Sequence, residues 1–127
     1  MGIRFEKDTI LNWINEMGKF LRLLTDSYDA FDEEKEPVDI EGGYMDFFKK
    51  DRSFFQEANL QQIDEFSDSL EIEQVRPLAQ LLMYDGLLNH DKSILIKSKH
   101  LFERNMQKTG AFSFEDYEYL AKIDKEL

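Results

Sequence analysis

The spacing of apolar residues between positions 8 and 31 is the feature that most constrains the fold of this chain. Apolar side chains recur there at intervals of three and four residues, which is the period of one face of an α-helix. They are Ile10, Trp13, Ile14, Met17, Phe20, Leu21, Leu24, Tyr28 and Phe31. Residues 8–31 are therefore predicted to form one long amphipathic helix, with Asp8 or Thr9 as its N-cap. Gly18 is expected to mark the close approach of another backbone.

Helical spacing continues through most of the remaining sequence. The further predicted helices cover 44–57, 60–70, a segment that begins between 71 and 77 and ends at 89–90, a segment from its N-cap Asp91 to Gly110, and 113–127. No segment alternates apolar and polar residues in the way a half-buried strand does. The sequence therefore predicts an all-α fold, a compact bundle of five or six helices in which a helical hairpin is followed by a final capping helix.

The last predicted helix has the clearest start signal. Ser113 is placed as its N-cap with Asp116 at the third helical position, a variant of the capping box, and Phe112 faces Tyr117 as a hydrophobic staple. The residues predicted for its core face are Phe114, Tyr117, Leu120, Ala121 and Leu127.

An acidic segment, residues 32–43, is predicted to be an exposed loop. It holds six acidic residues and one lysine, with Pro37 and the pair Gly42 and Gly43, and it lacks a helical apolar pattern. It is not taken as a domain boundary, because the single helix before it cannot bury its apolar face alone. Residues 1–127 are therefore predicted to form one helical domain.

Composition excludes several function classes. Sixteen Lys and Arg against 27 Asp and Glu give a net charge of −11, which argues against nucleic acid and anionic membranes as partners. The absence of cysteine removes disulfides, thiolate nucleophiles, cysteine zinc sites and iron–sulfur clusters. No apolar run approaches the roughly 18 to 20 residues that a membrane helix needs, so a cytoplasmic protein is expected.

Two resemblances to known families can be drawn. Around Gly86 the hairpin at residues 78–110 resembles a tetratricopeptide-type repeat, with Leu82, Ser98 and Phe102 at acceptable positions, whereas Asp85 and Asn89 depart from the pattern. Over its whole length the chain resembles an uncharacterised family of short bacterial helical proteins, a domain of unknown function. The segments that carry this resemblance are EKDTILNWINEMGKFLRLL, the acidic spacer, PLAQLLMYDGLL and FSFEDYEYLAKI. It implies a bacterial all-helical fold and transfers no activity, cofactor or site residue.

The candidate metal ligands are His90, Asp91 and Asp85. The alternative interpretation of His90 and Asp91 is that they cap the junction between two helices, because no convergent set of ligands is visible. The second histidine, His100, is predicted to pair with Glu103 on a helix surface. No motif for phosphate binding, nucleophilic catalysis or zinc hydrolysis is present, so no catalytic residue and no cofactor are predicted.

Two groups of residues are candidates for binding a protein partner. The segment from 92 to 108 carries a net charge of +4 in an acidic chain, through Lys92, Lys97, Lys99, Arg104 and Lys108. It is either a docking surface for an acidic segment or a face that balances acidic neighbours within the fold. The aromatic pairs Phe47, Phe48, Phe54 and Phe55 belong either to a contact with a partner or to the core.

The sequence favours a non-enzymatic helical protein–protein interaction domain, which binds a protein partner or associates with itself as a homodimer. Its docking site is expected in a groove beside the hairpin at residues 78–110 or on an aromatic patch between positions 44 and 55. The alternative hypothesis is a helical bundle that binds a small molecule or a metal through His90 and Asp91.

Overall fold

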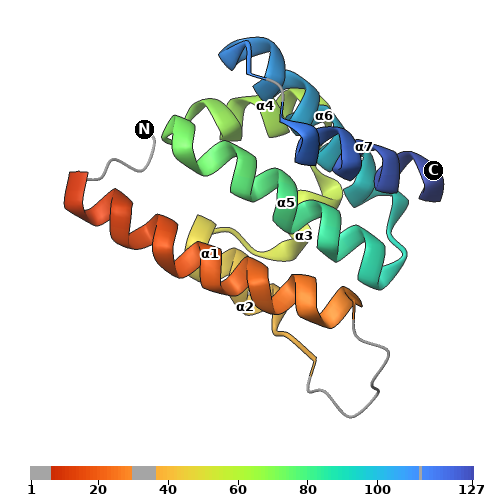
Figure 1. The fold of residues 1–127 in the computed structure, drawn as a ribbon, viewed down its shortest axis with the longest axis horizontal. Coiled ribbons are helices and arrows are strands. Elements are labelled where there is room, and N and C mark those ends of the chain that lie inside the picture. The colour runs from red at the N-terminus through yellow and green to blue at the C-terminus, as the bar shows by residue number, and fades with distance from the viewer. Residues whose placement is uncertain (1–6, 30–36, 112) are drawn as a thin grey trace.

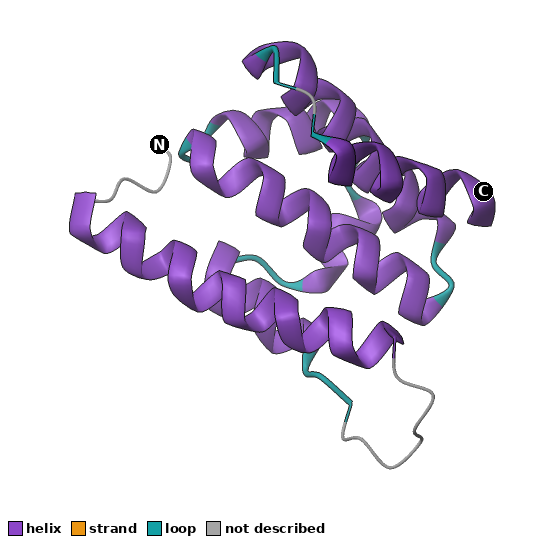
Figure 2. Cartoon of the chain, in the orientation of Figure 1, coloured by secondary structure: helices purple, strands orange, loops and turns teal. Residues whose placement is uncertain are grey.

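A computed structural model describes residues 7–29, 37–111 and 113–127 of the chain. Its described residues form seven helices and no strand (Figures 1 and 2). The helices are α1 (Lys7–Asp29), α2 (Ile40–Phe48), α3 (Arg52–Glu57), α4 (Leu60–Asp68), α5 (Ile72–Asn89), α6 (Lys92–Thr109) and α7 (Phe114–Glu126). The predicted all-α class is confirmed, although five or six helices were expected rather than seven.

The additional helix arises because the segment predicted as one helix over 44–57 is two. Lys49 ends α2 in the left-handed region with a φ of 58°, which few residues other than glycine adopt. Asp51 then begins α3, since its carboxylate accepts a hydrogen bond from the backbone N–H of Phe54 at 3.1 Å. Nothing in the apolar spacing marks this break, which depends on one backbone conformation and one cap.

The predicted acidic loop is shorter than expected. Asp39 caps α2 by accepting a hydrogen bond from the N–H of Gly42, so residues 40–43 are helical rather than loop. Residues 37–39 lie outside helices, and residues 32–36 are outside the described part of the chain. Similarly, α1 already includes Lys7, so the predicted caps Asp8 and Thr9 lie inside the helix.

The core is organised around α5, which packs against α1 on one side and against α6 and α7 on the other (Figure 1). The helices α5 and α6 are antiparallel and joined at His90 and Asp91. Gly86 lets them approach, because a Cβ atom there would lie 2.5 Å from Cγ of Leu95. Gly18 has the opposite environment: no atom of another element lies within 4 Å of the position of its Cβ, so the expected close approach of a backbone there is wrong.

The final helix begins as predicted but turns a different face to the core. Ser113 caps α7 through a hydrogen bond from the N–H of Asp116 at 3.0 Å, whereas Phe112 is outside the described residues. The buried residues of α7 are Asp116 and Ile123, and Phe114 is 81% exposed. The reason is that Asp116 pairs with Arg76 of α5 at 2.8 Å, and this contact sets the rotation of the helix. The predicted core residues Phe114, Tyr117 and Ala121 are therefore exposed.

Candidate functional site

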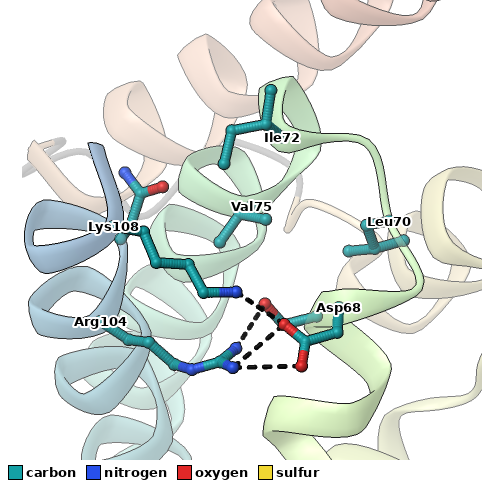
Figure 3. A pocket seen from close by; sticks show the side chains of 8 residues that line it. Asp68, Leu70, Ile72, Val75, Arg104 and Lys108 are labelled. Carbon is teal, nitrogen blue, oxygen red and sulfur yellow. Dashed lines mark hydrogen bonds and ion pairs between the residues drawn. The ribbon is translucent and has the colours of Figure 1, made fainter.

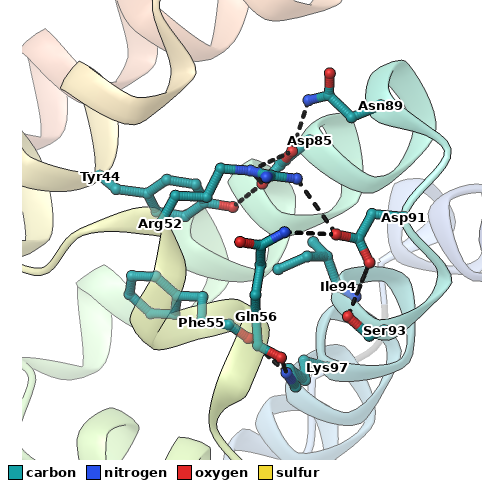
Figure 4. A network of polar contacts seen from close by, with 10 residues as sticks. All are labelled: Tyr44, Arg52, Phe55, Gln56, Asp85, Asn89, Asp91, Ser93, Ile94 and Lys97. Carbon is teal, nitrogen blue, oxygen red and sulfur yellow. Dashed lines mark hydrogen bonds and ion pairs between the residues drawn. The ribbon is translucent and has the colours of Figure 1, made fainter.

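The carboxylate of Asp85, in the fourth turn of α5, is the centre of a buried polar cluster. Its side chain is fully buried. It accepts hydrogen bonds from the Tyr44 hydroxyl at 2.6 Å, from Nε of Arg52 at 2.9 Å and from Nδ2 of Asn89 at 2.8 Å (Figure 4). We call these four residues the Asp85 network. It joins α2 and α3 to α5 over sequence intervals of 41 and 33 residues.

The electrostatics of the Asp85 network are those of a closed structural cluster. A buried carboxylate is costly unless it is paired and hydrogen-bonded. Asp85 meets both conditions, because it pairs with Arg52 and accepts hydrogen bonds from the neutral groups of Tyr44 and Asn89. Burial, followed by the nearby Asp85 charge, raises the pKa of Tyr44 well above its usual value, so the phenol keeps the proton that it donates. The hydrogen bond to Asp85 likewise raises the pKa of Arg52.

A second carboxylate, that of Asp91, lies beside the Asp85 network at the start of α6. It caps α6 by accepting a hydrogen bond from the N–H of Ile94 at 3.2 Å. It also accepts hydrogen bonds from Nε2 of Gln56 at 3.1 Å and from Ser93 Oγ at 2.8 Å, and it lies 3.4 Å from the Arg52 guanidinium (Figure 4). Burial raises the pKa of Asp91, but the hydrogen bonds from Gln56 and Ser93 outweigh it, so that pKa lies below its ordinary value.

The metal ligands predicted from the sequence are not brought together. Asp85 and Asp91 both contact Arg52, but His90 is exposed and serves as the left-handed C-cap of α5, with a φ of 53°. Across the described part of the chain, no group of three or more His, Cys, Asp or Glu side chains is placed to hold a metal ion. The departures from the tetratricopeptide pattern at Asp85 and Asn89 instead build the Asp85 network.

Of the five basic residues predicted to bind a partner, four are engaged inside the fold. The buried amino group of Lys97 donates to the carbonyls of Phe55 and Gln56 at the end of α3, and burial lowers its pKa. Lys99 pairs with Asp124 of α7 at 2.7 Å. Only Lys92 is exposed without an ion pair to another described residue.

The other two, Arg104 and Lys108, face the acidic side of α4. Arg104 lies 3.3 Å from Asp64 and 3.0 Å from Asp68, and Lys108 lies 2.7 Å from Asp68. The nearby His100 contacts Asp64 at 2.7 Å, rather than pairing with Glu103 as expected. We call these five residues the α4–α6 ladder; its members are Asp64, Asp68, His100, Arg104 and Lys108. Most of the basic side chains of α6 therefore pair with acidic residues of α4 and α7 within the fold.

The four phenylalanines predicted as a partner surface belong to the interior. Phe48 and Phe55 are buried, with 1% and 0% of their surface exposed. Phe47 and Phe54 are half-buried and pack against the same core. Trp13 of α1 donates its indole N–H to the carbonyl of Phe47 at 3.1 Å and has its ring edge-on to Phe47 and Phe48. An exposed aromatic patch over α2 and α3 is therefore not present, because these rings attach both helices to the core.

One hollow combines apolar and basic groups. It has a volume of about 110 Å³ and lies between the end of α4, the start of α5 and the last turns of α6 (Figure 3). Its apolar lining runs from the buried Val75 to Ile72, which is 52% exposed, and its charged lining is the end of the α4–α6 ladder that holds Asp68, Arg104 and Lys108. We call it the α4–α6 hollow; the residues that line it are Ser67, Asp68, Leu70, Ile72, Val75, Arg104, Asn105 and Lys108.

The α4–α6 hollow lies beside the hairpin of α5 and α6, where the sequence predicts a groove. Arg104 and Lys108 were among the predicted residues, whereas Ile72 and Val75 were not. One signal in the sequence could have indicated this apolar lining: Leu70 and Ile72 are apolar residues at the junction between two predicted helices. These two residues closely follow Asp68, which pairs with Arg104 and Lys108 of α6.

Two larger hollows are more polar. One, of about 300 Å³, adjoins the ladder and is lined by Asp64, His100, Glu103, Arg104 and Gln107. The other, of about 280 Å³, lies near the Asp85 network and is lined by Val38, Asp39, Ile40, Glu41, Arg52 and Asn89. Drug-sized ligands usually occupy apolar pockets of about 300 to 1,000 Å³, so neither of these hollows has the lining of such a site.

No protein-family model, no curated protein and no solved structure matches this chain. The two resemblances drawn from the sequence therefore remain predictions. Among the helices of the described residues, none combines the length and the apolar character needed to cross a membrane.

Proposed function

We propose that this chain is a non-enzymatic helical protein–protein interaction domain, and that it binds its partner at the α4–α6 hollow. The observation that supports this proposal is the composition of the hollow. The apolar side chains of Leu70, Ile72 and Val75 line the same hollow as the cations of Arg104 and Lys108. That combination suits a segment that presents one apolar side chain next to a carboxylate.

The volume of the hollow fits a side chain better than a cofactor. An apolar cavity of about 150 Å³ in another protein is large enough to hold benzene, and the α4–α6 hollow measures about 110 Å³. It is smaller than that cavity, so it has room for one apolar side chain at most. Small-molecule pockets begin at about 300 Å³, which favours a protein partner over a free ligand at this position.

The ion pair between Asp68 and Lys108 beside the hollow is available for exchange, whereas Arg104 is only 23% exposed. Asp68 holds both Arg104 and Lys108, but its side chain and that of Lys108 are each about half exposed to solvent. Exposed ion pairs of this kind contribute about 0–1 kcal/mol, so a carboxylate from a partner can share or replace Asp68 at little cost. One buried side chain adds about 1.5–3 kcal/mol, and the expected dissociation constant is therefore weak, above about 10 μM.

A peptide selection tests this proposal. A phage library of random peptides is selected on the immobilised protein, and the recovered peptides are synthesised and titrated by fluorescence anisotropy. We expect sequences that combine an acidic residue with a large apolar one, and binding that weakens at least fivefold in Ile72→Glu. The variant should fold, because Ile72 is 52% exposed and a glutamate in the first turn of α5 is favourable for a helix.

The matched control is Ile96→Glu, since Ile96 is 47% exposed on α6 and does not line the hollow. Peptides should bind this variant as well as they bind the unaltered protein. Recovery of no binding peptide, or equal loss of binding in both variants, would contradict a docking site in the α4–α6 hollow.

A further inference from the structure

We infer that the partner at the α4–α6 hollow is a second copy of this chain, which inserts the phenyl ring of Phe114 into it. This inference rests on the proposed function, because it names the occupant of the same site. The reasons are the exposure of Phe114, its fixed position at the start of α7, the location of the hollow at the same end of the molecule, and the charges of the two surfaces.

Phe114 is the most exposed of the large apolar side chains in the described structure, at 81%. It is also held in place, because it is the first residue of a helix that Ser113 caps. The next two residues, Glu115 and Asp116, both pair with Arg76, at 3.4 and 2.8 Å. A ring displayed from an ordered backbone loses little conformational freedom on binding, which favours it as an anchor.

The ring and the hollow lie at the same end of the molecule. Arg76, which holds the start of α7, directly follows Val75, which lines the hollow. Lys108, which also lines the hollow, lies in the last turn of α6, and a short connection leads from there to α7 (Figure 1). Phe114 does not fill the hollow of its own molecule, since it is exposed. Two copies related by a twofold axis can each place Phe114 in the hollow of the other.

The charges around the two surfaces are complementary. Glu115, beside Phe114, has a side chain that is 67% exposed. Lys108, which lines the hollow, is 49% exposed and is a cation in a chain of net charge −11. When the ring of one copy enters the hollow of the other, the carboxylate of Glu115 approaches the cations of Arg104 and Lys108. The exposed carboxylate of Glu115 would thus compete with Asp68 for the cations that line the hollow, which favours contact between the two surfaces.

Sedimentation velocity over a series of concentrations up to about 1 mM tests the inference. We expect a reversible monomer–dimer equilibrium, and an association constant at least tenfold lower in Phe114→Ser and in Ile72→Glu. Leu11→Ser is the matched control, because Leu11 is 50% exposed on α1, away from both surfaces, and this variant should dimerise normally. Circular dichroism confirms that each variant is folded.

A mixing experiment separates this contact from other modes of association. Phe114→Ser retains an intact hollow, and Ile72→Glu retains an intact ring, so an equimolar mixture can form one of the two contacts. We expect the mixture to associate more strongly than either variant alone. A wild-type protein that stays monomeric, or a dimer that survives Phe114→Ser, overturns the second copy as the partner. Binding of selected peptides by that monomer would still support the proposed function, whereas a monomer that binds no peptide would contradict both.

Discussion

The Asp85 network and the α4–α6 ladder are built from the same chemical groups but differ in their access to water. In each, carboxylates of one helix pair with an arginine of another. Asp85 is fully buried and Arg52 is 18% exposed; in the ladder Arg104 is 23% exposed, but Asp68 and Lys108 are each about half exposed. The buried pair has no solvent to replace a lost partner, so it holds helices together. The exposed pair can exchange partners at small cost, which makes its cations available for binding.

Removal of the central carboxylate should give the largest effect. Asp85→Ala leaves the Arg52 guanidinium, the Tyr44 hydroxyl and the Asn89 amide without their acceptor, and we expect a loss of about 3–5 kcal/mol in the free energy of unfolding. Urea denaturation followed by circular dichroism measures it. The matched variant in the ladder, Asp68→Ala, should lose less than about 1 kcal/mol. Equal losses in the two variants would remove the distinction between the clusters.

A single hydrogen bond of the Asp85 network should have an intermediate effect. Tyr44→Phe keeps the ring that stacks on Phe55 and removes only the donor to Asp85. We expect a loss of about 1.5–3 kcal/mol, as for a hydrogen bond to a charged group, measured in the same urea experiment. A protein that is unchanged by this substitution would show that Arg52 and Asn89 are sufficient to stabilise the buried carboxylate.

The dependence of stability on pH tests the α4–α6 ladder separately from the Asp85 network. Hydrogen bonds from Arg104 and then Lys108 lower the pKa of Asp68 from 3.8 to about 2. Because this pKa is lower in the folded chain than in the unfolded one, the contribution of Asp68 is complete above about pH 4 and is lost as the pH falls towards 2. Since Asp68 is half exposed and screened by solvent, the contribution is below about 1 kcal/mol.

The measurement is the difference in unfolding free energy between the wild-type protein and Asp68→Asn at several pH values. This difference should shrink between pH 4 and pH 2. A difference that stays constant over that interval would show that the ion pairs of Asp68 do not contribute to stability.

The smallest expected effect concerns binding. Asp68→Asn frees the cations of Arg104 and Lys108 from a competing carboxylate, so we expect the selected acidic peptides to bind a few-fold more tightly to it. Anisotropy titrations at about 0.1 M salt measure this effect, and it should decrease at about 1 M salt, where exposed charges are screened. Weaker binding by the variant would indicate that Asp68 itself contacts the peptide.

The sequence predicted those parts of the fold that depend on local signals. The helical class follows from the apolar spacing, and the caps at Asp91 and Ser113 follow from residue type. The missed features depend on contacts between residues distant in the sequence. Asp85 was considered as a metal ligand because its true partner, Arg52, lies 33 positions earlier in the sequence and no local pattern connects the two. The buried face of α7 was misplaced because Arg76 of α5 sets its rotation.

The candidate site was predicted in part. The sequence singled out five basic residues of α6 and predicted a groove beside the hairpin; two of those residues, Arg104 and Lys108, line the α4–α6 hollow. Lys97 was grouped with them because its burial beneath α3 has no sequence signature. The aromatic pairs were ambiguous, since adjacent phenylalanines are compatible with a core or with a surface. Rings from α1 and α4, those of Trp13, Phe20 and Phe66, pack against them and place them in the core.

The amino group of Lys97 also has a consequence for the order in which the chain folds. The helix α3 has six residues, too few to be stable in isolation, and its last carbonyls depend on a side chain 42 positions later in the sequence. The hairpin of α5 and α6 relies on contacts between closer residues, which form early. During synthesis on a ribosome, α2 and α3 therefore emerge before the helix that stabilises them, and we expect them to fold only after residues 92–109 have been made.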